Sequence, residues 1–275
     1  MQTLLAKRRT SFFRTVLLLV ILCASCTAFT ARAGEPSPED LAELATLKTE
    51  VAKIQGAVRA TNDPTEHERL QAQLTNQIDA SLAKLSLDAR PSMTVMFKVM
   101  APAQAAVSKY VTAAQAFFGG DDANWATLRS QTELAERRAR LTALIATGAA
   151  LRTRLDELEN DAMKAMRAIG ELPPARRMAI MNGLVAGALR PLIDLRPLRR
   201  IEGDLLGRYE AGFALLERNW GQWSARKGDD ASSIVWNASE SEQAIEWKKL
   251  NAEIDALVEK QEKIQEELAL AAVGK

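Results

Sequence analysis

The sequence predicts an all-α protein, an elongated helical bundle with long antiparallel coiled-coil helices. Ala, Leu, Glu, Arg and Gln are prominent in the composition, and strand-like alternation of apolar and polar residues is almost absent. Apolar residues also recur at alternating spacings of three and four in several segments. This is the heptad pattern of helices that pack side by side, so we expect helix-on-helix packing around the core.

The N-terminus has the three parts of a secretory signal peptide. A basic region precedes the apolar run VLLLVIL at residues 16–22, and Ala31, Arg32 and Ala33 form the small–x–small pattern of a signal peptidase site. The apolar run is shorter than the about 20 residues that a transmembrane helix needs. We therefore expect residues 1–33 to be cleaved after Ala33 and the protein to be exported, with a bacterial periplasm as the compartment that fits best.

Both cysteines, Cys23 and Cys26, lie inside this targeting segment. The small residues before Cys26 leave a lipid anchor on that cysteine as the alternative. Cleavage after Ala33 instead leaves a mature chain without any thiol, which excludes thiol catalysis, Cys-bound zinc and iron–sulfur clusters. An exported domain without disulfides must be stabilised by its hydrophobic core.

Charge and histidine content exclude further classes of function. The chain has 36 Lys+Arg against 35 Asp+Glu, and the signal peptide removes only bases, so the mature protein is mildly acidic and nucleic acid is not an expected partner. His67, the one histidine, lies at a predicted exposed helix start, so we expect neither a metal site nor a Ser-His-Asp triad. Acid pairs such as Asp156 and Glu159 are typical of solvated helix faces. We expect no catalytic residues, no cofactor and no metal, and thus no enzyme.

Residues 34–90 are predicted to form a helical hairpin. Ser37 is a suitable N-cap with Pro38 at the first helical position, and Asp63 and Pro64 begin a second helix after the break TNDP. The apolar line of the first helix is Leu44, Leu47, Val51, Ile54 and Val58, and that of the second is Leu70, Leu74, Ile78, Leu82 and Leu85. The short linker and the opposed apolar faces predict antiparallel packing.

Residues 91–223 are predicted to form a central helical bundle. The most apolar stretch of the mature chain, residues 92–120, is interpreted as a core helix that Pro102 kinks or splits, and the alternative is a membrane-inserting hairpin or a partner surface. Asp121 or Asp122 is expected to cap the next helix rather than to bind calcium. That helix should extend over 123–169 with any bend at Gly148.

The segment LRPLIDLRPLRR at residues 189–200 repeats LRPL at a six-residue interval. Its prolines predict an ordered bend that gathers four arginines: Arg190, Arg196, Arg199 and Arg200. Arginines bind phosphates, lipid headgroups or acidic partners, and they also form internal ion pairs. Internal pairing is favoured here because residues 229–275 are rich in acids, while an external partner stays open.

Residues 224–275 are predicted to form a polar loop and a long coiled-coil helix that packs back on the bundle, after an amphipathic helix over 198–223. Ser239 and Glu242 form a capping box. The seam of the helix is Trp247, Leu250, Ile254, Leu257, Gln261, Ile264, Leu268 and Ala271. Gln261 is the kind of polar seam residue that fixes register. The candidate partner-binding residues of this seam are Leu250, Ile254, Leu257 and Ile264.

Four tryptophans gather in the last quarter of the chain: Trp220, Trp223, Trp236 and Trp247. The favoured interpretation is that they close one end of the bundle. The alternative is that they line a pocket for a small molecule or lipid in a periplasmic binding module.

These observations predict an exported, non-enzymatic scaffold or adaptor. We expect it to be an accessory subunit of a cell-envelope membrane assembly that binds protein partners through its coiled-coil seams. The partner is expected to be membrane-embedded, or else a second copy that associates through the same seams, and contact with a membrane surface is possible through the arginine bend.

Overall fold

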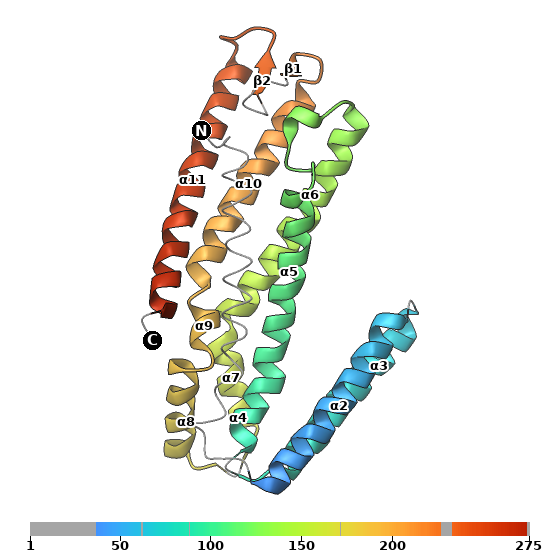
Figure 1. Cartoon of the computed structure of the whole chain (residues 1–275), viewed down its shortest axis with the longest axis vertical. Helices are drawn as coiled ribbons and strands as arrows, with labels where there is room; N and C mark the ends of the chain where they lie inside the picture. Colours follow the sequence, from blue (N-terminus) through green and yellow to red (C-terminus); the bar gives the residue numbers. More distant parts are fainter. Residues whose placement is uncertain (1–36, 62, 88, 171, 227–232, 274–275) are drawn as a thin grey trace. The chain divides into compact units, whose positions relative to one another are not determined.

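The structure is a computed structural model that describes residues 37–61, 63–87, 89–170, 172–226 and 233–273 (Figure 1). Apart from one two-stranded sheet, the regular elements of these residues are helices, so the predicted all-α class is confirmed. The predicted signal peptide, with both cysteines, lies outside the described residues.

Packing divides the chain into two compact units. The bundle unit contains Ala103–Asp156 and residues 191–273, and the hairpin unit contains residues 37–102 and Glu157–Arg190. Residues 157–190 therefore group with the hairpin, although the sequence placed them in a central bundle.

The bundle unit consists of four long helices that lie side by side (Figure 1). These are α5 (Ala101–Gly119), α6 (Gln131–Asp156), α10 (Arg196–Arg218) and α11 (Glu242–Val273). α10 packs against both α6 and α11. Both contacts are antiparallel, since Arg138 near the start of α6 pairs with Glu217 at the end of α10, and Arg218 pairs with Glu246 near the start of α11. This is the layered helix packing that buries one apolar stripe of each helix.

An aromatic cluster fills one end of the bundle unit. Trp125, in the short turn η3 (Trp125–Thr127), contacts Trp247 of α11 and Phe213 of α10, with ring centroids 4.4 and 5.4 Å away. α10 accommodates the Trp125 ring because residue 212 is glycine: a Cβ there would lie 2.1 Å from Trp125 Cη2. The cluster thus requires one tryptophan outside the C-terminal quarter and one glycine inside a helix.

The predicted helix over 123–169 is two helices. α6 ends at Asp156, and α7 (Leu158–Arg167) follows a break at Glu157 rather than at Gly148. Gly148 has a packing role instead, because a Cβ there would lie 3.0 Å from Cε2 of Tyr110 on α5. A glycine on a helical seam therefore marks a close approach of two helices here, and not a bend.

The predicted cap at Asp121 or Asp122 is wrong. The Ser130 hydroxyl accepts a hydrogen bond from the Glu133 amide at 3.1 Å, and this caps α6. Asp122 instead accepts two hydrogen bonds from Arg140, at 2.7 and 2.8 Å. The turn before α6 is held by the buried Arg137, which donates to the carbonyls of residues 121 and 124.

The hairpin unit begins with the predicted antiparallel pair, α2 (Pro38–Ala60) and α3 (Pro64–Lys84). Ser37 and Asp63 cap the two helices as expected. The unit also contains α4 (Arg90–Val95), the π-helical turn η2 (Met96–Met100), α7 and α8 (Pro174–Ala186). Leu82 and Leu85 at the end of α3 pack on Met93 of α4, so one end of the hairpin is anchored in the core of its own unit.

Three prolines lie where the sequence predicted irregular backbone. Directly before Pro102 the helix becomes the π-helical turn η2, a wider turn that accommodates the proline ring and its missing amide proton. In the arginine–proline segment, Pro191 and Pro197 each lie in the first turn of a helix, α9 (Arg190–Ile193) and α10. The LRPL repeat thus marks two successive helix starts, where proline is tolerated.

A short β-hairpin stands where the sequence predicted a polar loop and no strand. β1 (Trp223–Arg226) pairs antiparallel with β2 (Ser233–Trp236), and Trp223 lies opposite Trp236. Strands of four residues lie at the lower limit of length at which alternation indicates a strand. The Trp223 indole N–H donates to the carbonyl of Leu216 at 2.9 Å, which ties the hairpin to the end of α10.

Candidate functional site

The buried line of α11 departs from the predicted heptad seam after Ile254. The buried side chains of the helix are Ala244, Trp247, Leu250, Ile254, Val258, Gln261 and Gln265. Val258 and Gln265 thus occupy the positions that the heptad assigned to Leu257 and Ile264. A regular helix with 3.6 residues per turn drifts from a strict seven-residue repeat in this direction. The buried line therefore follows the predicted seam without a shift only as far as Ile254, and the predicted length of the coiled coil is not confirmed.

This shift leaves α11 with a second apolar line beside the buried one. Leu257, Ile264 and Leu268 are half-buried, and their spacings of seven and four residues place them on one face of the helix. Of the four candidate partner-binding residues of the seam, Leu250 and Ile254 lie in the core, and Leu257 and Ile264 remain accessible.

A groove of about 740 Å³ lies along the contact between α10 and α11, next to Leu257. Its lining residues are Gly203, Asp204, Gly207, Arg208, Glu253, Ala256 and Leu257. Gly207 is exposed, and a Cβ at this position would meet no atom within 4 Å. A mid-helix glycine costs about 1 kcal/mol relative to alanine. The packing of the bundle unit itself gives no reason for that cost.

Three charged residues line the groove, two acidic and one basic. Arg208 pairs with Glu253 across it at 3.1 Å. Asp204 adds a second carboxylate to the α10 side and is exposed. A helix with an apolar face and a basic residue would complement this arrangement of small, apolar and acidic side chains.

The arginine bend is largely occupied by internal contacts. Arg196 Nε donates to the carbonyl of Leu155 at 2.9 Å, at the end of α6. Arg200 lies 3.7 Å from Asp156, and Arg199 is buried against Glu202. Arg190 is exposed and makes an interaction of its own within the protein. The partners found for Arg196, Arg199 and Arg200 come from α6 and α10, whereas the sequence suggested acids from the terminal segment.

Three of the four C-terminal tryptophans are buried, and the fourth packs on one of them. Trp223, Trp236 and Trp247 are buried, and Trp220 is 37 % exposed and stacks edge-on with Trp223 at 5.2 Å. The centre of the aromatic cluster is Trp125, which sequence reasoning missed because it is distant in sequence from the others. The glycine at position 212, in the middle of an otherwise regular amphipathic helix, was the available signal.

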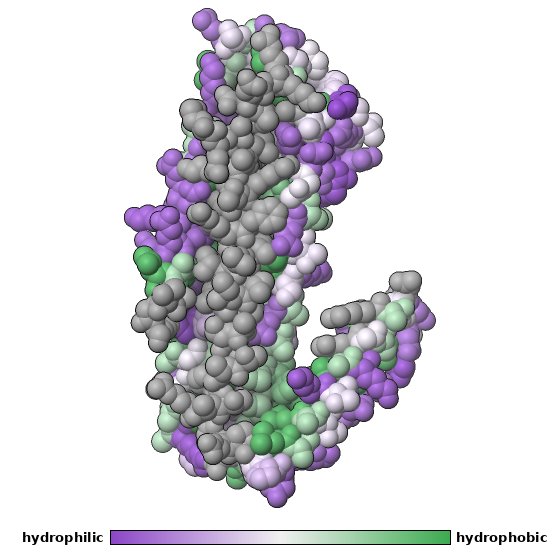
Figure 2. Space-filling view, viewed as in Figure 1, coloured by the Kyte–Doolittle hydropathy of each residue, from purple (hydrophilic) through white to green (hydrophobic). Residues whose placement is uncertain are grey.

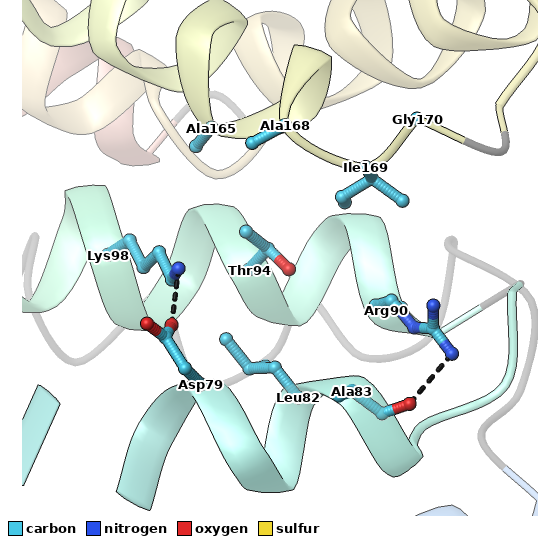
Figure 3. Close-up of a pocket in the computed structure, with 10 residues that line it drawn as sticks. All are labelled: Asp79, Leu82, Ala83, Arg90, Thr94, Lys98, Ala165, Ala168, Ile169 and Gly170. Atoms are coloured by element: carbon cyan, nitrogen blue, oxygen red, sulfur yellow. Dashed lines mark hydrogen bonds and ion pairs between the residues drawn. The ribbon is translucent and has the colours of Figure 1, made fainter. Parts of the chain in front are cut away.

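A second groove, of about 450 Å³, lies in the hairpin unit between α3, the α4–η2 segment and the end of α7 (Figure 3). Lys98 at one edge pairs with Asp79. Arg90 at the other edge donates to the carbonyls of Ala83 and Leu85 at 2.8 and 2.9 Å, and so caps the end of α3. The opposite wall consists of Ala165, Ala168, Ile169 and Gly170. Both cations make contacts with α3. The rest of the groove lining therefore consists mainly of small apolar groups.

The hairpin unit also exposes two leucines. Leu41 is 55 % and Leu87 is 44 % exposed. In sequence they follow Asp40 and Ser86, which are hydrogen-bonded to each other. Hydrophobic surface is visible near this end of the hairpin, while much of the hairpin surface in view is hydrophilic (Figure 2).

In the described residues neither a metal site nor a single membrane-spanning helix is found. Within them no group of three or more His, Cys, Asp or Glu side chains could hold a metal ion. No single helix of the described segments is long and apolar enough to cross a membrane, although α8 and α9–α10 pass this test together as a bent pair.

Known proteins do not extend this description. No protein-family profile matches the chain. Neither a curated protein nor a solved structure matches it.

Proposed function

We propose that the protein is an exported, non-enzymatic helical scaffold or adaptor, an accessory subunit of a cell-envelope assembly. It binds a helix of a protein partner in the groove between α10 and α11. The observation that carries this proposal is the second apolar line of α11, which lies half-exposed beside a groove that small residues keep open.

The groove is suited to a helix because a second backbone can approach closely there. Gly207 and Ala256 present almost no side chain, and Leu257 supplies apolar surface next to them. Helices pack at interaxial distances of 8–10 Å, and the closer distances require small residues at the contact. Burying one leucine side chain in such a contact contributes about 1.5–3 kcal/mol.

The partner helix should be amphipathic and carry a basic residue. Ile264 and Leu268 extend the apolar line of α11 by further turns, so the partner's apolar face would follow that line. A lysine or arginine on its edge would face Asp204, which raises the association rate and fixes the direction of docking more than it raises affinity.

The experiment is affinity purification of the tagged protein from a mild-detergent envelope extract, comparing two leucine variants of α11. Leu257→Asp places a charge in the groove and should reduce recovery of a stoichiometric partner at least tenfold. Leu270→Asp is the matched control, because Leu270 is 74 % exposed on the same helix, and it should retain the partner.

Two results would contradict the proposal. One is a partner that stays bound to Leu257→Asp while the helicity of this variant, measured by circular dichroism, is unchanged. The other is recovery from the cytosol at the mass of the uncleaved chain, because export predicts a protein that begins at Gly34.

A further inference from the structure

A layer of polar side chains crosses the core of the bundle unit. Arg199 and Glu202 of α10 are each 2 % exposed, and Gln261 and Gln265 of α11 are 1 % and 3 % exposed. Tyr110 of α5 completes the layer, with the Arg199 guanidinium 5.0 Å from the centre of its ring. Buried charged residues are rare in protein cores and need an explanation.

One carboxylate links the helices in this layer. Glu202 Oε1 accepts hydrogen bonds from Arg199 Nη2 at 2.7 Å and from Gln261 Nε2 at 3.3 Å. The second of these bonds joins α10 and α11 inside the core. It is long for an N–H···O hydrogen bond, so α11 gains little from it.

Some polar atoms of the layer have no hydrogen-bond partner. Arg199 Nε is buried without a hydrogen-bond partner. Arg152 of α6 adds a second positive charge that acts on Glu202. Burial raises the pKa of Glu202, and Arg199 and Arg152 oppose this. Removing charged groups from water is unfavourable, and the attraction within a buried pair often fails to offset this cost.

The two halves of α11 are therefore held by different contacts. Between Ala244 and Val258 the buried side chains are apolar, whereas from Gln261 onwards they are glutamines. From position 266 to position 271, every side chain of the helix is half-buried or exposed. Burial of apolar area is the main term that holds a helix against its neighbour, and no apolar side chain among residues 259–271 is fully buried.

We infer that the polar layer makes the C-terminal half of α11, residues 259–273, a segment that detaches from the bundle unit while residues 242–258 stay docked. Detachment exposes Arg199 and Glu202 to water. The favourable free energy of their hydration offsets part of the free energy that is lost with the contacts of α11. Sub-global opening of this kind concentrates in segments with few buried apolar contacts. The inference does not depend on the proposed partner, although opening would also move Ile264 away from α10.

The test is hydrogen–deuterium exchange of the purified protein, read by mass spectrometry of peptides from the two halves of α11. Residues 259–267 should exchange at least tenfold faster than residues 248–258. The triple variant Arg199→Met, Glu202→Leu, Gln261→Leu replaces the layer with apolar side chains and should slow exchange of residues 259–267 at least tenfold. Simple fraying of a helix end would not respond to that change.

A second variant keeps the inference testable if the triple variant fails to fold. Gln261→Ala removes the donor to Glu202 and should accelerate exchange of residues 259–267, with residues 248–258 unchanged. Arg208→Ala is the control, because its pair with Glu253 is exposed on the same two helices. The inference is overturned if both halves of α11 exchange together in the unmodified protein. It is also overturned if neither layer variant changes the ratio between them.

Discussion

Asp40 is the residue whose environment is most clearly set by the fold. Its carboxylate accepts hydrogen bonds from the amide and hydroxyl of Ser86, both at 2.8 Å, and from the Ser37 amide at 3.1 Å. These bonds, those of Ser86 first, lower the pKa of Asp40 from 3.8 to about 2. The same side chain completes the capping box of α2 and joins its start to the end of α3.

We expect Asp40→Asn to lower the free energy of unfolding by about 2 kcal/mol at neutral pH, because the variant loses the charge that these donors stabilise. Since the folded-state pKa is depressed, this contribution is complete above about pH 4 and is lost as the pH falls towards 2. Urea denaturation at pH 5 and pH 2.5 checks this. A stability difference between variant and unmodified protein that does not shrink at pH 2.5 would contradict the assignment.

Two glycines of α10 offer a matched pair of substitutions. Gly212→Ala should destabilise the protein by about 1–3 kcal/mol, because the new methyl group would overlap the Trp125 ring, which is itself packed among aromatic neighbours. Gly207→Ala should instead be neutral or stabilise by up to about 1 kcal/mol, since nothing lies near its Cβ and alanine favours the helix. Thermal unfolding of both variants measures the contrast. Equal effects would show that the Trp125 ring does not rest on Gly212.

At the scale of elements, the start of α6 gives a direct comparison between the predicted cap and the observed one. Ser130→Ala should cost about 1 kcal/mol, because it removes the hydroxyl that accepts the Glu133 amide. Asp122→Ala should cost less than about 0.5 kcal/mol, because its pair with Arg140 is solvent-exposed. Chemical denaturation of the two variants ranks them, and the reverse order would restore Asp122 as the more important residue.

Helices whose ends carry strong local signals could be predicted from the sequence. Ser37 with Pro38, and Asp63 with Pro64, mark the starts of α2 and α3 because capping is a local interaction. The start of α6 could not be located in this way, because several polar residues precede it and the choice depends on how Arg137 holds the turn.

Only some of the groove residues could be predicted from the sequence, because their burial depends on how two helices pack. A heptad pattern identifies Leu257 and Ile264 as apolar positions, but it does not say whether the helix supercoils enough to bury them. Burial of Val258 and Gln265 follows from the geometry of α11 against α10, which is a property of two helices together. Trp125 and Gly212 likewise acquire their roles through a contact between distant segments.

At the scale of the whole molecule, the two units divide the chain in a non-contiguous way. The path leaves the bundle unit after Asp156 and returns at Pro191, so residues 157–190 of the hairpin unit connect α6 with α10. The hairpin unit contributes its own core around Leu82 and Leu85, and the bundle unit contributes the groove. This arrangement would suit an adaptor, because each unit presents a separate surface to which a partner could bind.

The most direct test of the partner proposal is photocrosslinking in intact cells, with a photoreactive amino acid placed singly at position 207 or at position 270. Position 207 lies in the groove, and position 270 is exposed on α11. A partner helix in the groove should give one discrete crosslinked adduct from position 207, and none of the same mass from position 270. Absence of an adduct at position 207, or the same adducts from both positions, would contradict the claim that the groove between α10 and α11 holds a partner helix.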